Sequence, residues 1–190
     1  MKNYTNSRRN FLSKMLITSL SGAALLTTSA VAKGRRSSTS TSTPITEAQK
    51  DKLFFIYQEE KVARDVYITL GEMYPSENTF ASIQLSEQRH IDAARGLCTK
   101  YGVNISGVDE GSVGNFVLPV LQELYDTCVA QGAESHLDAL KVGELIEVTD
   151  IKDLEDSMVG MPNDVVNVFS NLKEGSLNHL DAFRSAIARA

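Results

Sequence analysis

The stretch S-E-Q-R-H-I-D at residues 86–92 indicates both the fold of this chain and the chemistry of its interior. Apolar residues on either side of it recur at alternating steps of three and four, which is typical of a helix that turns one face toward a core. Glu87 and His90 fall on that apolar face. Because a buried carboxylate or imidazole is costly unless it has a partner, the pattern predicts a helix with a functional interior.

Helical periodicity extends over most of the chain. Thr46 and Gln49 form a capping-box pattern, Pro75 separates the first two helices, and Gly175 predicts a break in the last one. With 12 Gly, 4 Pro and no Trp in 190 residues, the composition favours a single all-α domain. The predicted helices cover about residues 46–73, 79–101, 115–131, 135–159 and 164–190.

The apolar stripes of four of these helices turn polar near their middles. In an antiparallel hairpin, two residues lie level when their numbers average to the centre of the loop. Glu60 and Glu87 meet this condition beside Pro75. Beside Pro162, Glu144 meets it with His179, and Glu147 meets it with Ser176. If the two hairpins pack together, four carboxylates and two imidazoles converge inside a helical bundle.

A bound metal explains this convergence. Burying an ion costs on the order of several kcal/mol unless it is paired, and no Lys or Arg lies on the stripes at that height. Carboxylates mixed with imidazoles suit two divalent ions such as iron or manganese. The predicted metal ligands are Glu60, Glu87, His90, Glu144, Glu147 and His179.

Other residues compete for these roles. Glu59 lies on a rival stripe of the first helix, and Asp150 becomes a ligand if the inner face of the 135–159 helix is misphased by one residue. His136, near a helix start, is expected to be structural or exposed. Cys98 and Cys128 match no metal motif, and their pairing as a disulfide in an oxidising compartment stays open.

Residues 1–32 have the features of an export signal. S-R-R-N-F-L-S-K at 7–14 resembles a twin-arginine motif, and A-V-A at 30–32 suits a signal peptidase. The apolar run between them is short for a membrane span of about 20 residues. We therefore expect a twin-arginine-type signal, a Ser/Thr-rich linker over 33–46, and a folded domain over 47–190 that is periplasmic or otherwise exported and free of the membrane.

The charge of the domain excludes some partners. The whole chain has 19 basic and 24 acidic residues, a net charge of −5. The first 32 residues hold four of the basic residues and none of the acidic ones, so their removal leaves a net charge of −9. A protein this acidic is expected to repel nucleic acid and anionic membrane surfaces.

Several motifs resemble those of known proteins. E-x-x-A-R-x-x-Y at 60–67, E-x-x-H at 87–90 and G-E-x-x-E at 143–147 are similar to motifs of rubrerythrin helices. E-E-K-V-A-R-D-V-Y at 59–67 and G-S-L-N-H-L-D-A-F at 175–183 resemble the DUF2202 domain family more closely, over about residues 47–187. The resemblance implies a ferritin-like four-helix bundle with an extra short helix in the crossover connection and a di-iron carboxylate centre. The predicted ligands match its ligand positions.

The resemblance also implies an activity, with one departure. It implies two iron ions, with manganese or zinc as alternatives, and O2, peroxide or Fe(II) as the substrate of an oxidase, peroxidase or ferroxidase. Tyr67 is expected to be a hydrogen-bond donor beside the centre, and a homodimer is compatible with the fold. However, Ser176 stands where a rubrerythrin has a bridging glutamate, and no Cys-x-x-Cys pair is present. The competing hypotheses are a non-enzymatic module that binds, stores or senses metal and a metal-free interaction domain.

Overall fold

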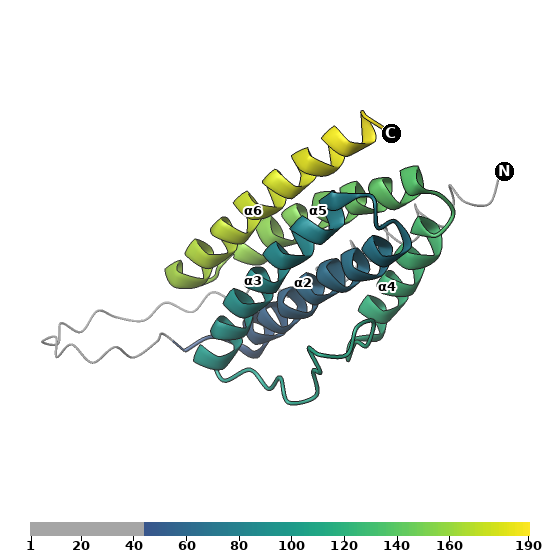
Figure 1. Ribbon diagram of the computed structural model, residues 1–190. Helices are drawn as coiled ribbons and strands as arrows, with labels where there is room; N and C mark the ends of the chain where they lie inside the picture. The colour runs from purple at the N-terminus through teal and green to yellow at the C-terminus, as the bar shows by residue number, and fades with distance from the viewer. Residues whose placement is uncertain (1–43) are drawn as a thin grey trace, which may run out of the picture. The chain divides into compact units, whose positions relative to one another are not determined.

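The computed structural model describes residues 44–190, and these residues fold into five helices (Figure 1). Among the described residues there is no strand, so the all-α prediction is confirmed. The predicted break at Gly175 is wrong, because the last helix continues through it. The helices are α2 (Glu47–Met73), α3 (Asn78–Lys100), α4 (Pro119–Gly132), α5 (His136–Met158) and α6 (Asn163–Ile187).

Local sequence signals account for the helix ends. At the start of α2, Thr46 Oγ1 accepts a hydrogen bond from the Gln49 backbone N–H at 3.2 Å, and Gln49 Oε1 accepts one from the Thr46 N–H at 2.7 Å. This is the capping box that the sequence predicts. Ser135 caps α5 in the same way, through a 3.1 Å bond from the Asp138 N–H. Gly160, at φ +77°, supplies the left-handed turn between α5 and α6.

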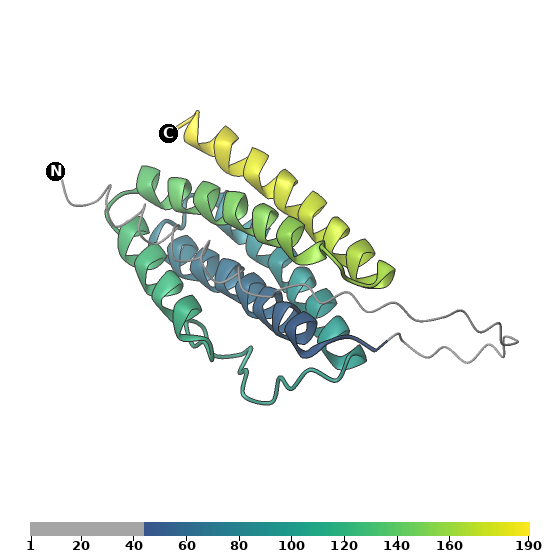
Figure 2. The same cartoon turned by 180° about the vertical axis from the view of Figure 1, so that it is seen from behind.

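Four long helices enclose one core as two hairpins, α2–α3 and α5–α6 (Figures 1 and 2). Helix α2 also packs against α5, and α3 packs against α6, so that each of the four contacts two others. The shorter α4 lies outside this ring and packs against α2 and α5. A side chain that points inward from any of the four therefore reaches a shared interior.

The direction of the helices requires a long crossover. Helices α2 and α5 are antiparallel, because Tyr67 reaches Glu147 while Lys52, fifteen residues earlier, bonds to the carbonyl of Asp156 at 3.2 Å. Since α2 and α3 form an antiparallel hairpin, α3 and α5 run in the same direction. The chain must therefore return along the bundle between them. Residues 101–135, which include α4, make this return (Figure 1).

Two apolar layers fill the bundle and leave a polar level between them. One layer is built around Leu53, Ile91 and Phe169. The other contains Tyr67 and Phe183, whose ring centroids lie 5.1 Å apart. Gly143 belongs to the second layer, since an added Cβ there would lie 2.3 Å from Phe183 Cε1. The glycine of the G-E-x-x-E motif is thus explained by the close approach of an aromatic ring.

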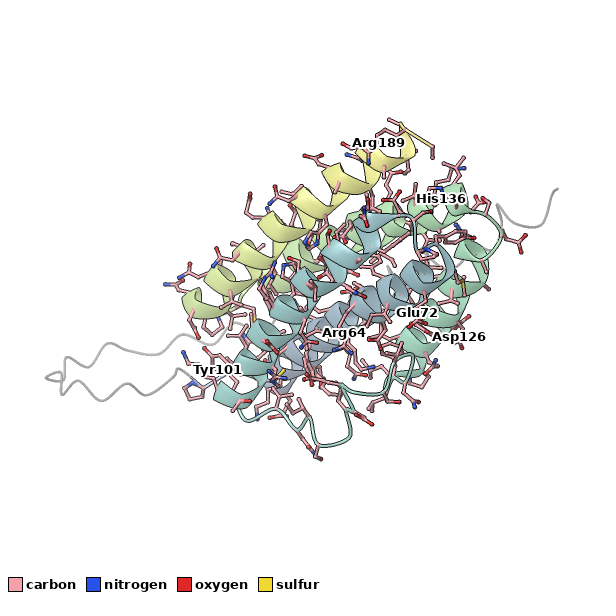
Figure 3. The ribbon with its side chains drawn as sticks, viewed as in Figure 1. Arg64, Glu72, Tyr101, Asp126, His136 and Arg189 are labelled. Carbon is pink, nitrogen blue, oxygen red and sulfur yellow. The ribbon has the colours of Figure 1, made fainter. Side chains whose placement is uncertain are left out.

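Helix α2 is buried on every side from Ile56 to Tyr67, although this segment contains five charged residues. Its two cations are satisfied by the connection that precedes α4. Lys61 Nζ donates to Asp65 Oδ2 at 2.6 Å and to the Ser112 carbonyl at 2.8 Å. Arg64, labelled in Figure 3, donates to Asp65 Oδ1 and to the Glu110 carbonyl. Both cations are therefore bound on the outer side of α2 and do not neutralise the interior.

Cys98 and Cys128 are both free and buried, so they form no disulfide. Burial raises the pKa of each thiol to about 12. Within residues 44–190, no helix combines the length and the apolar character that crossing a bilayer requires. The predicted signal at 1–32 and most of the predicted linker at 33–46 lie outside the described residues and stay predictions.

Candidate metal centre

Five of the six predicted ligands meet at the polar level of the bundle. They come from all four long helices: Glu60 from α2, Glu87 and His90 from α3, Glu147 from α5, and His179 from α6. None of the five is more than 7% exposed. The ligand atoms of Glu87, His90 and His179 all lie within 4.8 Å of one another, which is close enough to hold one metal ion.

The carboxylates and the imidazoles contact one another directly. His90 Nδ1 lies 3.1 Å from Glu60 Oε2 and 2.9 Å from Glu87 Oε2. His179 Nδ1 lies 2.7 Å from Glu87 Oε1 and 3.6 Å from Glu147 Oε2. The two rings are stacked, with centroids 5.3 Å apart. Glu87 therefore stands between the two imidazoles and would hold a metal ion together with them.

Several of these atoms have no hydrogen-bond partner. Glu60 Oε1, Glu87 Oε1 and His179 Nδ1 are all buried and none of them makes a well-aligned hydrogen bond, although the last two form an ion-pair contact of 2.7 Å. Leaving a buried polar atom unsatisfied costs about 1–3 kcal/mol. Buried carboxylate oxygen and imidazole nitrogen atoms that converge this closely have the arrangement of ligands around a shared cation. The donor set thus fits divalent ions that accept both oxygen and nitrogen, such as iron, manganese or zinc.

Glu144 is the predicted ligand that the structure does not bring to the cluster. Its side chain is 34% exposed, and its Oε1 accepts a 2.9 Å bond from Arg184 Nε. The inner face of α5 instead carries Gly143, Glu147 and Asp150. The predicted apolar stripe of this helix is therefore misphased. The reason is physical: at the height of the site the core positions of this helix hold a glycine and two acids, and some of its large apolar residues are exposed.

Asp150 occupies the place in the cluster that the sequence predicts for Glu144. It is 4% exposed, its Oδ2 accepts a 2.6 Å bond from Ser176 Oγ, and its Oδ1 has no partner. Across the hairpin, the observed pairs are Glu147 with His179 and Asp150 with Ser176. The predicted pairs were displaced by one helical turn of α5. The level still contains four carboxylates and two imidazoles, with Asp150 in place of Glu144.

Burial and mutual repulsion shift the pKa values of the acids in the cluster. Burial raises the pKa of Glu60 to about 7, against the opposing effect of His90. Burial and the charge of Glu87 raise the pKa of Glu147 to about 8. For Glu87 burial acts in the same direction, but the two imidazoles outweigh it and lower its pKa to about 2. In Asp150, burial and the neighbouring carboxylates raise the pKa well above its usual value.

The pKa values of the two imidazoles shift in the opposite direction from those of ordinary buried histidines. Burial by itself lowers a histidine pKa, but the adjacent carboxylates raise the pKa of His90 to about 11 and that of His179 to about 9. In the metal-free protein, both rings therefore carry a proton at neutral pH. These two positive charges partly offset the acids, which is the role that a bound cation would fill.

Two neighbours fix the orientation of the ligands. The Tyr67 hydroxyl donates a 2.6 Å bond to Glu147 Oε1. Burial and the charge of Glu147 raise the pKa of Tyr67 well above its usual value, so this group stays a donor. Gly175 faces the other side of the cluster, where an added Cβ would lie 2.4 Å from His90 Nε2. This close approach explains why α6 carries a glycine within a continuous helix.

The fold and the site define a class: an all-helical protein with a buried cluster of carboxylates and histidines that is able to hold a metal ion. More particularly, the chain belongs to the family described as "Uncharacterized protein domain (DUF2202)", whose family model matches residues 49–190. The predicted resemblance to this family is thereby confirmed.

One relative is known from both its sequence and its crystal structure. Uncharacterized protein MJ0754 of Methanocaldococcus jannaschii is 43% identical to this chain over 141 residues, which are 74% of this chain and 75% of the relative. A crystal structure of hypothetical protein MJ0754 matches with a TM-score of 0.75 at 40% identity, and covers 80% of this chain and 86% of that one.

Proposed function

We propose that this chain is an exported di-iron carboxylate protein of the ferritin-like superfamily that reacts with O2 or peroxide. One observation carries the proposal: four carboxylates and two imidazoles from four helices are buried together, and the cations of α2 are bound elsewhere. The fold supports it as well. Ferritin-like proteins place their metal ligands on facing helices of a bundle with one long crossover, and the connection over 101–135 is such a crossover.

The proposed ligand set differs from the sequence prediction in one member. Asp150 replaces Glu144, because it is buried with an unpartnered oxygen whereas Glu144 pairs with Arg184 near the surface. When bound, two iron ions would supply redox chemistry toward O2 or peroxide, with manganese or zinc as alternatives. The proposed ligands are Glu60, Glu87, His90, Glu147, Asp150 and His179.

The chain's own residues have three roles in this proposal. The carboxylates balance the charge of the ions and hold their positions. Tyr67 and Ser176 each donate a hydrogen bond to a carboxylate, which leaves the second oxygen of Glu147 or Asp150 free to bind. The aromatic layer around Phe183 closes one end of the site and excludes water from it.

A metal-binding, storage or sensing module is the alternative, and burial is the observation that favours it. The most exposed of the proposed ligands, His90 and His179, are only 7% exposed. A closed site of this kind is typical of a structural metal centre, whereas a catalytic centre keeps a position open to substrate. A small oxidant needs little space to enter, so burial does not by itself decide between the two functions. Measuring the rate of oxidation distinguishes them.

Anaerobic Fe(II) titration followed by rapid mixing tests the proposal. We expect up to two Fe(II) per chain and faster oxidation by O2 or peroxide than for free Fe(II). Oxidation at the rate of free Fe(II), with full metal binding, would leave the binding module as the function. Absence of metal from protein purified after native export, together with no uptake of Fe(II), would contradict both functions.

Export is a separate part of the proposal and rests on the sequence around Arg8 and Arg9. Replacing both by lysine is expected to hold the precursor in the cytoplasm, which fractionation and immunoblotting measure. Unchanged periplasmic yield would indicate the general secretory route. Homodimer formation stays a prediction that light scattering of the purified protein tests.

A further inference from the structure

Glu59 is a second buried acid on α2, next to the proposed ligand Glu60. It is 4% exposed, and its Oε2 has no hydrogen-bond partner. The nearest cations along the helix, Lys61 and Arg64, are bound to Asp65 and to the connection before α4. A buried carboxylate without a partner is costly, and the proposed ligand set does not use this one.

The antiparallel packing of α2 on α5 places Glu59 opposite two more acids. Tyr67 lies level with Glu147, and Gln49 Nε2 donates to the Gly160 carbonyl at 2.7 Å. Interpolation between these two contacts brings Glu59 level with about residue 153 of α5, one helical turn from Asp150. Asp153 lies within hydrogen-bonding reach of Glu59, and the charges of Asp150 and Asp153 both act on it.

The three carboxylates span the distance between the surface and the centre. Asp153 is half-buried and Glu59 is buried. Asp150 is buried too, and it bonds to Ser176 at the polar level of the bundle. Lys152, the basic neighbour of Asp153 along the chain, pairs with Asp156. A row of three carboxylates therefore extends from the surface to the centre between α2 and α5.

We propose that Glu59 and Asp153 form an uptake site for a divalent metal ion, from which the ion passes through Asp150 to the buried centre. The proposal rests on the metal centre proposed above. Its chemistry suits a transient site, because carboxylate oxygens without an imidazole bind divalent ions more weakly than a mixed set does. Carboxylates that line a path also raise the local cation concentration and thereby the rate of association.

Stopped-flow absorbance with Co(II) measures uptake directly. In Glu59→Gln, Asp153→Asn and the double variant, we expect Co(II) to occupy the centre about tenfold more slowly than in wild type, with the same final stoichiometry. Asp156→Asn and Glu155→Gln are the controls, since both acids are on α5 but pair with lysines at the surface. We expect each control to retain the wild-type rate.

Three outcomes overturn the proposal. Equal uptake rates in wild type and both single variants show that the acids are not on the path. A lower final stoichiometry in Glu59→Gln shows that Glu59 is itself a ligand of the centre. A wild-type protein that binds no Co(II), Fe(II) or Zn(II) contradicts the metal centre, and this proposal with it. If Glu59→Gln fails to fold, the half-buried Asp153→Asn decides the question by itself.

Discussion

Ser176 on α6 donates a 2.6 Å hydrogen bond to Asp150 on α5, and both residues are buried at the level of the two imidazoles. The sequence places a serine where a rubrerythrin-like motif carries a glutamate. The facing helix supplies a carboxylate at the same height. The centre therefore contains four carboxylates, with Asp150 of α5 at the height where that motif places a glutamate on α6.

Asp150→Asn is expected to lower metal content by about one ion per chain, because the variant loses a carboxylate of the proposed second site. Glu144→Gln is the matched control, since Glu144 is partly exposed and bonds to Arg184. Elemental analysis and Fe(II) titration measure the stoichiometry. The reverse result, loss of metal in Glu144→Gln alone, would restore the ligand set that the sequence predicts.

Gly175→Ala and Gly96→Ala are expected to act in opposite directions. A Cβ at residue 175 would lie 2.4 Å from His90 Nε2, so the ring must move. We expect Gly175→Ala to lose about 1–3 kcal/mol of stability and to weaken metal binding. An added Cβ at Gly96 meets nothing within 4 Å, so Gly96→Ala should gain about 0.5–1 kcal/mol. Urea unfolding with and without metal measures both, and equal effects would contradict the packing.

The metal-free protein is expected to lose stability as the pH rises from about 5 to 9. Burial raises the folded-state pKa of Glu60 to about 7 and that of Glu147 to about 8, and the carboxylates raise the pKa of His179 to about 9. The folded state therefore binds more protons than the unfolded state in this range, and its stability falls with pH. The pKa of Glu87 is lowered, to about 2, so its opposite effect on stability falls at a pH below this range.

Calorimetry of the protein in chelator at several pH values measures this slope. Glu60→Gln removes one of the contributing groups and should flatten the slope. A divalent metal must displace protons from the imidazoles, so the stabilisation that it adds is expected to be larger at pH 8 than at pH 6. A melting temperature that rises with pH in chelator would contradict the predicted proton balance.

Tyr67→Phe is expected to weaken metal binding about 10–100-fold, because Glu147 Oε1 loses the donor that orients it. Tyr125→Phe is the control, since its hydroxyl bonds to Thr69 on the outer side of α2. Isothermal titration with Zn(II) measures both affinities without oxidation chemistry. If both variants bind Zn(II) as wild type does, Tyr67 has no role in holding the ligand.

The fold class and most helix bounds were predictable from the sequence because apolar periodicity dominates α2, α3 and α6. The cluster formed by Glu60, Glu87 and His90 was predictable for the same reason, since each residue interrupts an otherwise apolar stripe. Proline and glycine between these helices also marked the turns. Gly175 misled the prediction, because it is required by the His90 ring and not by a break.

Helix α5 shows where this reasoning fails. At the height of the site its inner face carries Gly143, Glu147 and Asp150, so the apolar pattern is interrupted there over more than one turn. The burial of Glu59 was equally hard to predict. It depends on α5, which brings Asp150 and Asp153 against this side of α2, and no local pattern reveals that contact.

The division of the ligands between the hairpins has a consequence for the order of folding. Three of the proposed ligands belong to α2–α3 and three to α5–α6, so neither hairpin alone forms the site. Each hairpin presents acids that repel those of the other as the two approach. Protons or metal ions must therefore accompany docking, and the last cooperative step of folding should depend on their concentration.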